Sequence, residues 1–158
     1  MYRLYFWAKR VIKNEKNSVI LHRLAEKIIG HIEAYYNLFV KKMYIKHPSD
    51  KIGITVKKRE QKIIVSLTSF PKRIDTLWIT IETLLRQSMK PDEIILWLAE
   101  EQFNGIDSLP KALLEQQKRG LTIRFCDDLR SHKKYYYTMQ EYPRDIVILV
   151  DDDMFYPK

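Results

Sequence analysis

Short apolar runs alternate with longer helical patterns throughout residues 62–158, and this alternation constrains the fold more than any other feature of the sequence. Runs rich in β-branched and aliphatic residues occur at 63–68, 93–99, 121–125 and 145–150. Segments with helical periodicity lie between them, at 74–87, 109–119 and 131–141. Strands joined by helices of about 10–15 residues pair in parallel. The sequence therefore predicts an α/β fold of βαβ units with a mostly parallel sheet.

Three consecutive carboxylates, Asp151, Asp152 and Asp153, follow the last apolar run. Residues 145–150 are aliphatic enough to predict a strand buried on both faces. Open α/β sheets bind their ligands at the C-terminal ends of the strands. Three adjacent like charges repel, so a folded chain keeps them together only where something compensates their charge. A divalent cation is the usual compensator because hard cations take oxygen ligands. A solvated acidic loop is the alternative, and we prefer the cation because the cluster follows a predicted core strand.

The positive charge of the chain is concentrated in its N-terminal part. The 158 residues suffice for one ordinary domain, and Cys126 is the only cysteine, which excludes an internal disulfide. Residues 1–58 contain 13 Lys/Arg and 4 acidic residues, a net charge of +9. Residues 59–158 contain 15 basic and 16 acidic residues, a net charge of −1. This division argues against a nucleic-acid-binding core and leaves the N-terminal part as the segment that needs a partner.

Residues 1–46 are predicted to be helical, because apolar residues recur at steps of three and four with basic residues between them. The apolar patch at 4–8 is too short for a signal-peptide core or a membrane span. A basic amphipathic helix with Trp and Tyr is able to lie on an anionic membrane surface, and packing on the domain or on another copy is an equal alternative. We divide the chain into a basic helical extension and linker at 1–58 and an α/β domain at 59–158.

The second part also carries motifs of a known family. They are the run 63–68 with the loop Ser69-Phe70-Pro71-Lys72-Arg73, the phrase Pro91-Asp92-Glu93-Ile94-Ile95-Leu96, the Lys133-Lys134-Tyr135 helix, and Asp151-Asp152-Asp153 as an Asp-x-Asp motif. With these motifs, residues 62–158 resemble the N-terminal, nucleotide-binding half of a GT-A glycosyltransferase of the family 2-like, bacterial surface-polysaccharide type. The resemblance implies a Rossmann-like sheet and a role in polysaccharide biosynthesis.

The resemblance implies transfer of a sugar from a nucleotide-diphosphate sugar to a glycan or lipid-linked acceptor, with Mn²⁺ or Mg²⁺ as the metal. It implies that Asp153 binds the metal and that Asp151 lies near the ribose and shares the metal, whereas the orientation of Asp152 stays open. Further candidates for binding the nucleotide are Thr68, Ser69, Arg73, Asp128 and Lys133. The two cations complement phosphate oxygens. Asp128, or its neighbour Asp127, could accept a hydrogen bond from the base or cap the following helix.

The family carries a second half after the Asp motif, which supplies the acceptor site and, in inverting members, the general base. We therefore expect a truncated form that binds a donor with little turnover, and we assign no catalytic residue. A haloacid-dehalogenase-type phosphatase also has Asp-x-Asp after a buried strand, but it normally has this motif early in the chain. The competing hypothesis is a non-enzymatic interaction module whose basic arm binds an anionic membrane or nucleic acid.

We favour the glycosyltransferase and expect no nucleic-acid partner. We expect a cytoplasmic protein, because a single cysteine calls for no oxidising compartment and the patch at 4–8 is too short for a signal-peptide core. Its basic helix leaves open a peripheral contact with the inner face of the membrane.

Overall fold

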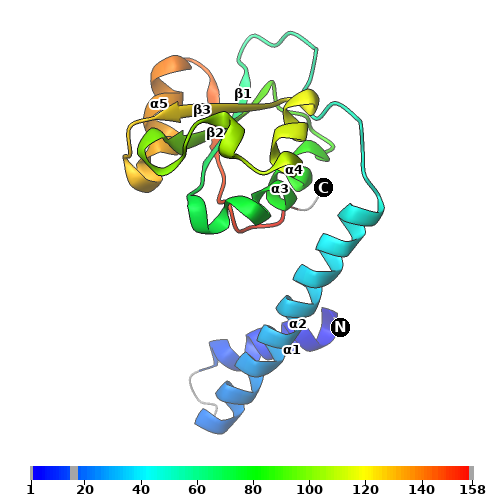
Figure 1. Cartoon of the computed structure of the whole chain (residues 1–158). Coiled ribbons are helices and arrows are strands. Elements are labelled where there is room, and N and C mark those ends of the chain that lie inside the picture. The colour runs from blue at the N-terminus through cyan, green and yellow to red at the C-terminus, as the bar shows by residue number, and fades with distance from the viewer. Residues whose placement is uncertain (1, 15–17, 157–158) are drawn as a thin grey trace. The chain divides into compact units, whose positions relative to one another are not determined.

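The computed structural model describes residues 2–14 and 18–156, and the chain forms two compact units, Met1–Pro48 and Ser49–Lys158 (Figure 1). The first unit is helical. The second is an α/β unit with a four-stranded sheet whose strands all run parallel. The predicted α/β class with a parallel sheet is thus confirmed. None of the described helices combines the length and the apolar character that a bilayer crossing requires.

The first unit contains two helices, α1 (Tyr2–Lys13) and α2 (Val19–Lys46), instead of the single helical stretch that the sequence predicts. A new helix begins after Ser18, because its hydroxyl accepts a hydrogen bond from the backbone N–H of Leu21 (3.4 Å). The two helices pack through small and β-branched side chains. The buried residues of this contact are Ala8, Val11, Ala25 and Ile29.

The sheet consists of β1 (Ile63–Thr68), β2 (Glu93–Ala99), β3 (Leu121–Cys126) and β4 (Ile146–Leu149), in the spatial order β3-β2-β1-β4. Successive side chains of a strand point to opposite faces, and both faces of the central strands are apolar. On one face Val65, Ile94 and Leu96 join the larger core cluster. On the other face Ile64, Ile95 and Trp97 form a second cluster. The apolar runs at 63–68 and 93–99 therefore fold as fully buried strands.

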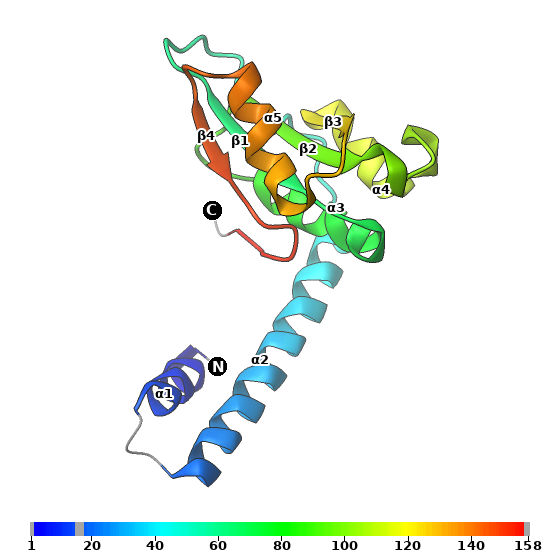
Figure 2. The same cartoon turned by 90° about the vertical axis from the view of Figure 1, so that its left-hand side faces the viewer.

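One helical layer lies on each face of the sheet. The helix α3 (Pro71–Leu85) and the short α4 (Lys111–Leu114) contribute Leu77, Ile81 and Leu113 to the larger cluster. The helix α5 (Lys133–Glu141) covers the other face, where Tyr137 packs on the second cluster (Figure 2). The sheet is thus covered on both sides, as parallel sheets require.

The predicted helix at 109–119 is confirmed as a helical segment from Lys111 to Arg119, but it is not α-helical throughout. Only α4 is α-helical, and Glu115–Arg119 forms a 3₁₀ helix, η3. Short 3₁₀ helices also occur at Glu100–Gln102 (η1), Ile106–Ser108 (η2) and Arg130–His132 (η4). Gly120 ends η3 as predicted, with a φ of 114° that disfavours any residue with a Cβ. Such short turns have no periodicity from which the sequence could distinguish them.

The prediction that residues 145–150 are buried on both faces is also wrong. β4 is an edge strand that pairs only with β1, and Ile146, Ile148 and Leu149 are 48%, 44% and 41% exposed. Val150, one residue past the strand, is buried in the larger cluster. The pairing with β1 nevertheless brings the three carboxylates to the same end of the sheet as the end of β1.

The segment between the helical unit and β1 packs on the α/β unit. The backbone N–H of Gly53 donates to the carbonyl of Arg119, and that of Thr55 donates to Pro91 (both 2.8 Å). A Cβ at Gly53 would lie 2.4 Å from Leu85 Cδ2, so only glycine permits this approach. Arg119 in turn forms a buried ion pair with Glu82 of α3.

Candidate functional site

A polar cleft of about 550 Å³ opens at the carboxyl ends of the strands. The chain passes from β1 to β2 and β3 on one side, and β4 then pairs with β1 on the other side. Such a reversal of strand order leaves a crevice in which open α/β sheets bind ligands. The residues that line the cleft are Thr68, Ser69, Phe70, Arg73, Gln102, Asp128, Arg130, Ser131, Lys133, Lys134, Asp151, Asp152 and Asp153.

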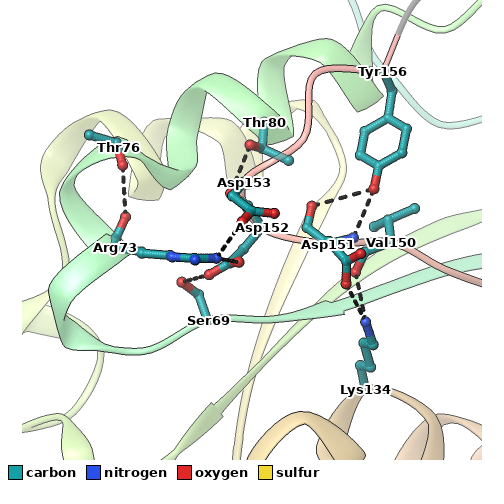
Figure 3. A network of polar contacts seen from close by, with 10 residues as sticks. All are labelled: Ser69, Arg73, Thr76, Thr80, Lys134, Val150, Asp151, Asp152, Asp153 and Tyr156. Atoms are coloured by element: carbon teal, nitrogen blue, oxygen red, sulfur yellow. Dashed lines mark hydrogen bonds and ion pairs between the residues drawn. The ribbon is translucent and has the colours of Figure 1, made fainter. Parts of the chain in front are cut away.

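Asp152 is the enclosed member of the carboxylate triplet, with a side chain only 10% exposed. Its two carboxylate oxygens accept hydrogen bonds from Ser69 Oγ (2.7 Å) and Arg73 Nη1 (2.6 Å), and its carbonyl accepts from Thr80 Oγ1 (2.9 Å) (Figure 3). Pro71 begins α3 directly after this loop, where its lack of an N–H costs nothing. Through these hydrogen bonds Asp152 connects the turn after β4 to the loop between β1 and α3 and to α3 itself.

The other two carboxylates are more exposed, and only Asp151 turns to a different cation, whereas Asp153 shares Arg73 with Asp152 (Figure 3). Asp151 is 66% exposed and pairs with Lys134 Nζ of α5 (2.6 Å). Asp153 is 52% exposed and pairs with Arg73 Nη1 (3.0 Å). The hydrogen bond that Arg73 donates to Asp152, followed by the negative charges of Asp152 and Asp153, raises the pKa of Arg73 above its ordinary value. The three like charges are thus compensated by two side-chain cations on two different helices.

Asp151 and Asp153 are the two exposed carboxylates of the triplet, and their chemistry is the kind that a divalent ion takes. Carboxylate oxygens are the ligands that Mg²⁺ and Mn²⁺ prefer, and Mg²⁺ commonly takes one or two carboxylates together with substrate phosphates. Asp151 and Asp153 provide two such groups, whereas Asp152 is held by Ser69 and Arg73. Within residues 2–14 and 18–156 no three His, Cys, Asp or Glu side chains converge as a metal cage. Among the described residues the protein thus offers at most two carboxylates here, so any ion would need further oxygen ligands from a bound molecule or from water.

Asp128 lies at the opposite wall of the cleft, after β3. It accepts hydrogen bonds from Lys133 Nζ (2.5 Å), Gln102 Nε2 (2.8 Å) and the backbone N–H of Arg130 (2.8 Å). These donors, the Lys133 ammonium first, lower the pKa of the Asp128 carboxyl. The Lys133 side chain is only 4% exposed. A carboxylate offers about four lone-pair sites, so Asp128 keeps about one for a ligand while it holds the loop together.

Arg130 differs from the other cations of the cleft. Its φ of 53° is the one positive value of a non-glycine residue among the described residues, and the hydrogen bond from its N–H to Asp128 holds this conformation. Arg73, Lys133 and Lys134 each face a carboxylate. The structure of the described residues shows no carboxylate partner for the guanidinium of Arg130. Arg130 is therefore the cleft cation that a ligand anion meets uncompensated.

The structure brings all the predicted site residues to this one cleft, from the ends of three strands. Their individual situations differ from the expectations. The hydroxyl of Thr68 donates to the carbonyl of Trp97 (2.7 Å), and that of Ser69 donates to Asp152. Both hydroxyl protons are therefore used in hydrogen bonds within the protein. Arg73 and Lys133, the predicted candidates for contacts with the diphosphate or the base, are paired with carboxylates.

Sequence reasoning missed Arg130 and Lys134 as site residues. Lys134 could have been found, because it stands beside Lys133 at the start of a helix that faces the Asp strand. Arg130 gave no such signal, because a positive φ is unusual for arginine and depends here on a contact with Asp128. Comparisons with protein-family models, curated proteins and solved structures found no match to this chain.

Proposed function

We propose that the α/β unit binds a nucleotide-diphosphate sugar and belongs to a glycosyltransferase of the GT-A type, with a Rossmann-like nucleotide-binding half. The observation that carries this proposal is the position of two exposed carboxylates, Asp151 and Asp153, in a polar cleft at the reversal of the strand order. The acceptor in this proposal is a glycan or a lipid-linked glycan. No catalytic residue is assigned among the described residues.

In this proposal different residues of the cleft bind different parts of the donor. A divalent ion at Asp151 and Asp153 would neutralise the diphosphate and favour departure of the sugar. Lys134 and Arg73 pair with these carboxylates, so they lie within reach of the same phosphates. Asp128 and Gln102 form the far wall, where the one acceptor site left on Asp128 suits an N–H of the base. Asp152 positions the turn and contributes no ligand.

The test is metal-dependent binding measured by calorimetry. The full chain is titrated with a panel of nucleoside diphosphates and sugar nucleotides, with Mn²⁺ and with chelator. We expect one class of nucleotide to bind with Mn²⁺, and Asp151→Asn with Asp153→Asn to abolish the metal-dependent part. Asp107→Asn, an exposed carboxylate on η2 outside the cleft, is the matched control and should bind like the wild type. Failure of every nucleotide to bind in the presence of metal would refute the proposal.

A further inference from the structure

The helix α1 presents two different faces. One face contributes Ala8 and Val11 to the contact with α2, and these side chains are 0% and 8% exposed. An adjoining, exposed side of the helix has Arg3, Phe6, Trp7 and Arg10, at the steps of three, four and seven that align side chains along a helix. This second group is called the outer face of α1 below. The contact with α2 buries Ala8 and Val11, whereas the outer face stays exposed to solvent.

The outer face combines exposed aromatic rings with cations. Phe6 and Trp7 are 57% and 43% exposed, although aromatic side chains carry the largest apolar surfaces of all residues. Arg3 and Arg10 flank them, and Lys13 follows on the next turn. Aromatic rings between basic side chains are typical of helices that lie at the boundary between lipid headgroups and acyl chains. The rings enter the apolar layer while the cations stay among the phosphates.

The charge of the unit distinguishes between possible partners. Residues 1–48 contain ten Lys/Arg and three acidic residues, a net charge of +7. A second copy of this unit would bring an equal positive charge against the same face, and the two would repel. An anionic bilayer is attracted instead, with about a fivefold gain in binding for each cation near the surface.

We propose that α1 docks in the plane of an anionic lipid surface through its outer face, with Phe6 and Trp7 inserted and Arg3 and Arg10 on the headgroups. This inference is independent of the proposed glycosyltransferase function, because it concerns only the helical unit. It assigns α2 as the support that keeps the apolar side of α1 covered while the outer face is in the membrane.

The test is co-sedimentation of the full chain with lipid vesicles. We expect binding to vesicles of phosphatidylcholine with phosphatidylserine, a steep loss of binding at high salt, and no binding to phosphatidylcholine alone. Arg3→Gln with Arg10→Gln should weaken binding about 25-fold, that is, fivefold for each cation. Phe6→Ser with Trp7→Ser should abolish it. Circular dichroism checks that each variant keeps its helices.

The matched control removes two similarly exposed apolar side chains from α2, in Leu38→Ser with Phe39→Ser, which are 62% and 52% exposed in the wild type. This control should bind like the wild type. The inference is overturned if the wild type ignores anionic vesicles or if both double variants lose binding equally. It is also overturned if the outer-face variant instead converts a dimer to a monomer, or loses binding to an oligonucleotide while vesicle binding persists.

Discussion

Replacement of Arg130 tests how much this one side chain contributes to binding of a nucleotide in the cleft, while the carboxylates of the cleft stay unchanged. Arg130→Ala removes the cleft cation that faces no carboxylate among the described residues. If the cleft holds the diphosphate of a sugar nucleotide, this guanidinium is free to donate to phosphate oxygens without first breaking an ion pair. Arg73 and Lys133 would have to leave Asp152 and Asp128 before they could do the same.

The magnitude follows from the setting of the side chain. A hydrogen bond between a charged donor and a charged acceptor contributes about 1.5–3 kcal/mol. Arg130 is exposed at the rim of the cleft, so water screens the interaction and the lower end of this range applies. About 1.5 kcal/mol corresponds to about a tenfold increase in Kd for the nucleotide. Arg130→Lys keeps the charge but loses the forked geometry of the guanidinium, so its Kd should lie between those of the wild type and Arg130→Ala.

Calorimetric titration with the nucleotide that the wild type binds measures the effect. Arg144→Ala is the matched control, because Arg144 is exposed and precedes β4, at the end of the strand opposite to the carboxylates. Arg130→Gly adds a second control, because glycine adopts the φ of 53° without strain and should keep the loop folded and the melting temperature unchanged or higher. Wild-type affinity in both Arg130→Ala and Arg130→Gly would refute the reasoning, even where the nucleotide itself binds.

Two further predictions concern the core. The fully buried Thr138 Oγ1 forms a hydrogen bond with Ser66 Oγ (2.8 Å) and accepts one from Trp97 Nε1 (2.7 Å). Thr138→Val leaves the indole N–H without an acceptor and should lower the free energy of unfolding by about 2 kcal/mol. Urea unfolding measures this change, and the control Thr76→Val, on the surface of α3, should change the free energy of unfolding little. Burial raises the pKa of Cys126 from 9.0 to about 11, so the buried neutral thiol contributes its full stability below pH 9 and loses it between pH 9 and 11. The free energy of unfolding of the wild type should therefore decline over this range, and Cys126→Ala should lack this part of the decline. An identical decline in the two proteins would contradict the prediction.

The central part of the fold could be predicted from the sequence because its pattern is unambiguous. β1 and β2 are aliphatic on both faces, and helices separate them from their neighbours, which permits few arrangements other than a covered parallel sheet. The burial of β4 could not be predicted, since four aliphatic residues occur equally in a central strand and in an edge strand. What decides its burial is the strand order, and that depends on contacts between residues more than 80 positions apart, such as Ile63 with Ile146.

The site could be located but not resolved into roles. Three strand ends rich in polar residues meet in one cleft, as the parallel sheet requires, and this much is readable from spacing. The ion pairs are not readable, because they join Arg73 to Asp152 and Lys134 to Asp151 across different layers of the unit. These ion pairs determine which cation is already paired with a carboxylate and which is available to a ligand. The sequence alone therefore could not show that Arg130 is more available than Arg73.

The ion pairs that compensate the three carboxylates have a consequence for any metal at this site. A cluster that needed an ion for its charge balance would stay repulsive without one, and the fold would depend on the metal. Here Arg73 and Lys134 compensate the charges, and Asp152 is largely enclosed, with hydrogen bonds that a metal would have to break. An ion at Asp151 and Asp153 must therefore displace two cations, which costs free energy unless those cations gain new anionic partners. The phosphates of the nucleotide in our proposal would be such partners, so these ion pairs would favour simultaneous binding of metal and nucleotide over binding of metal alone.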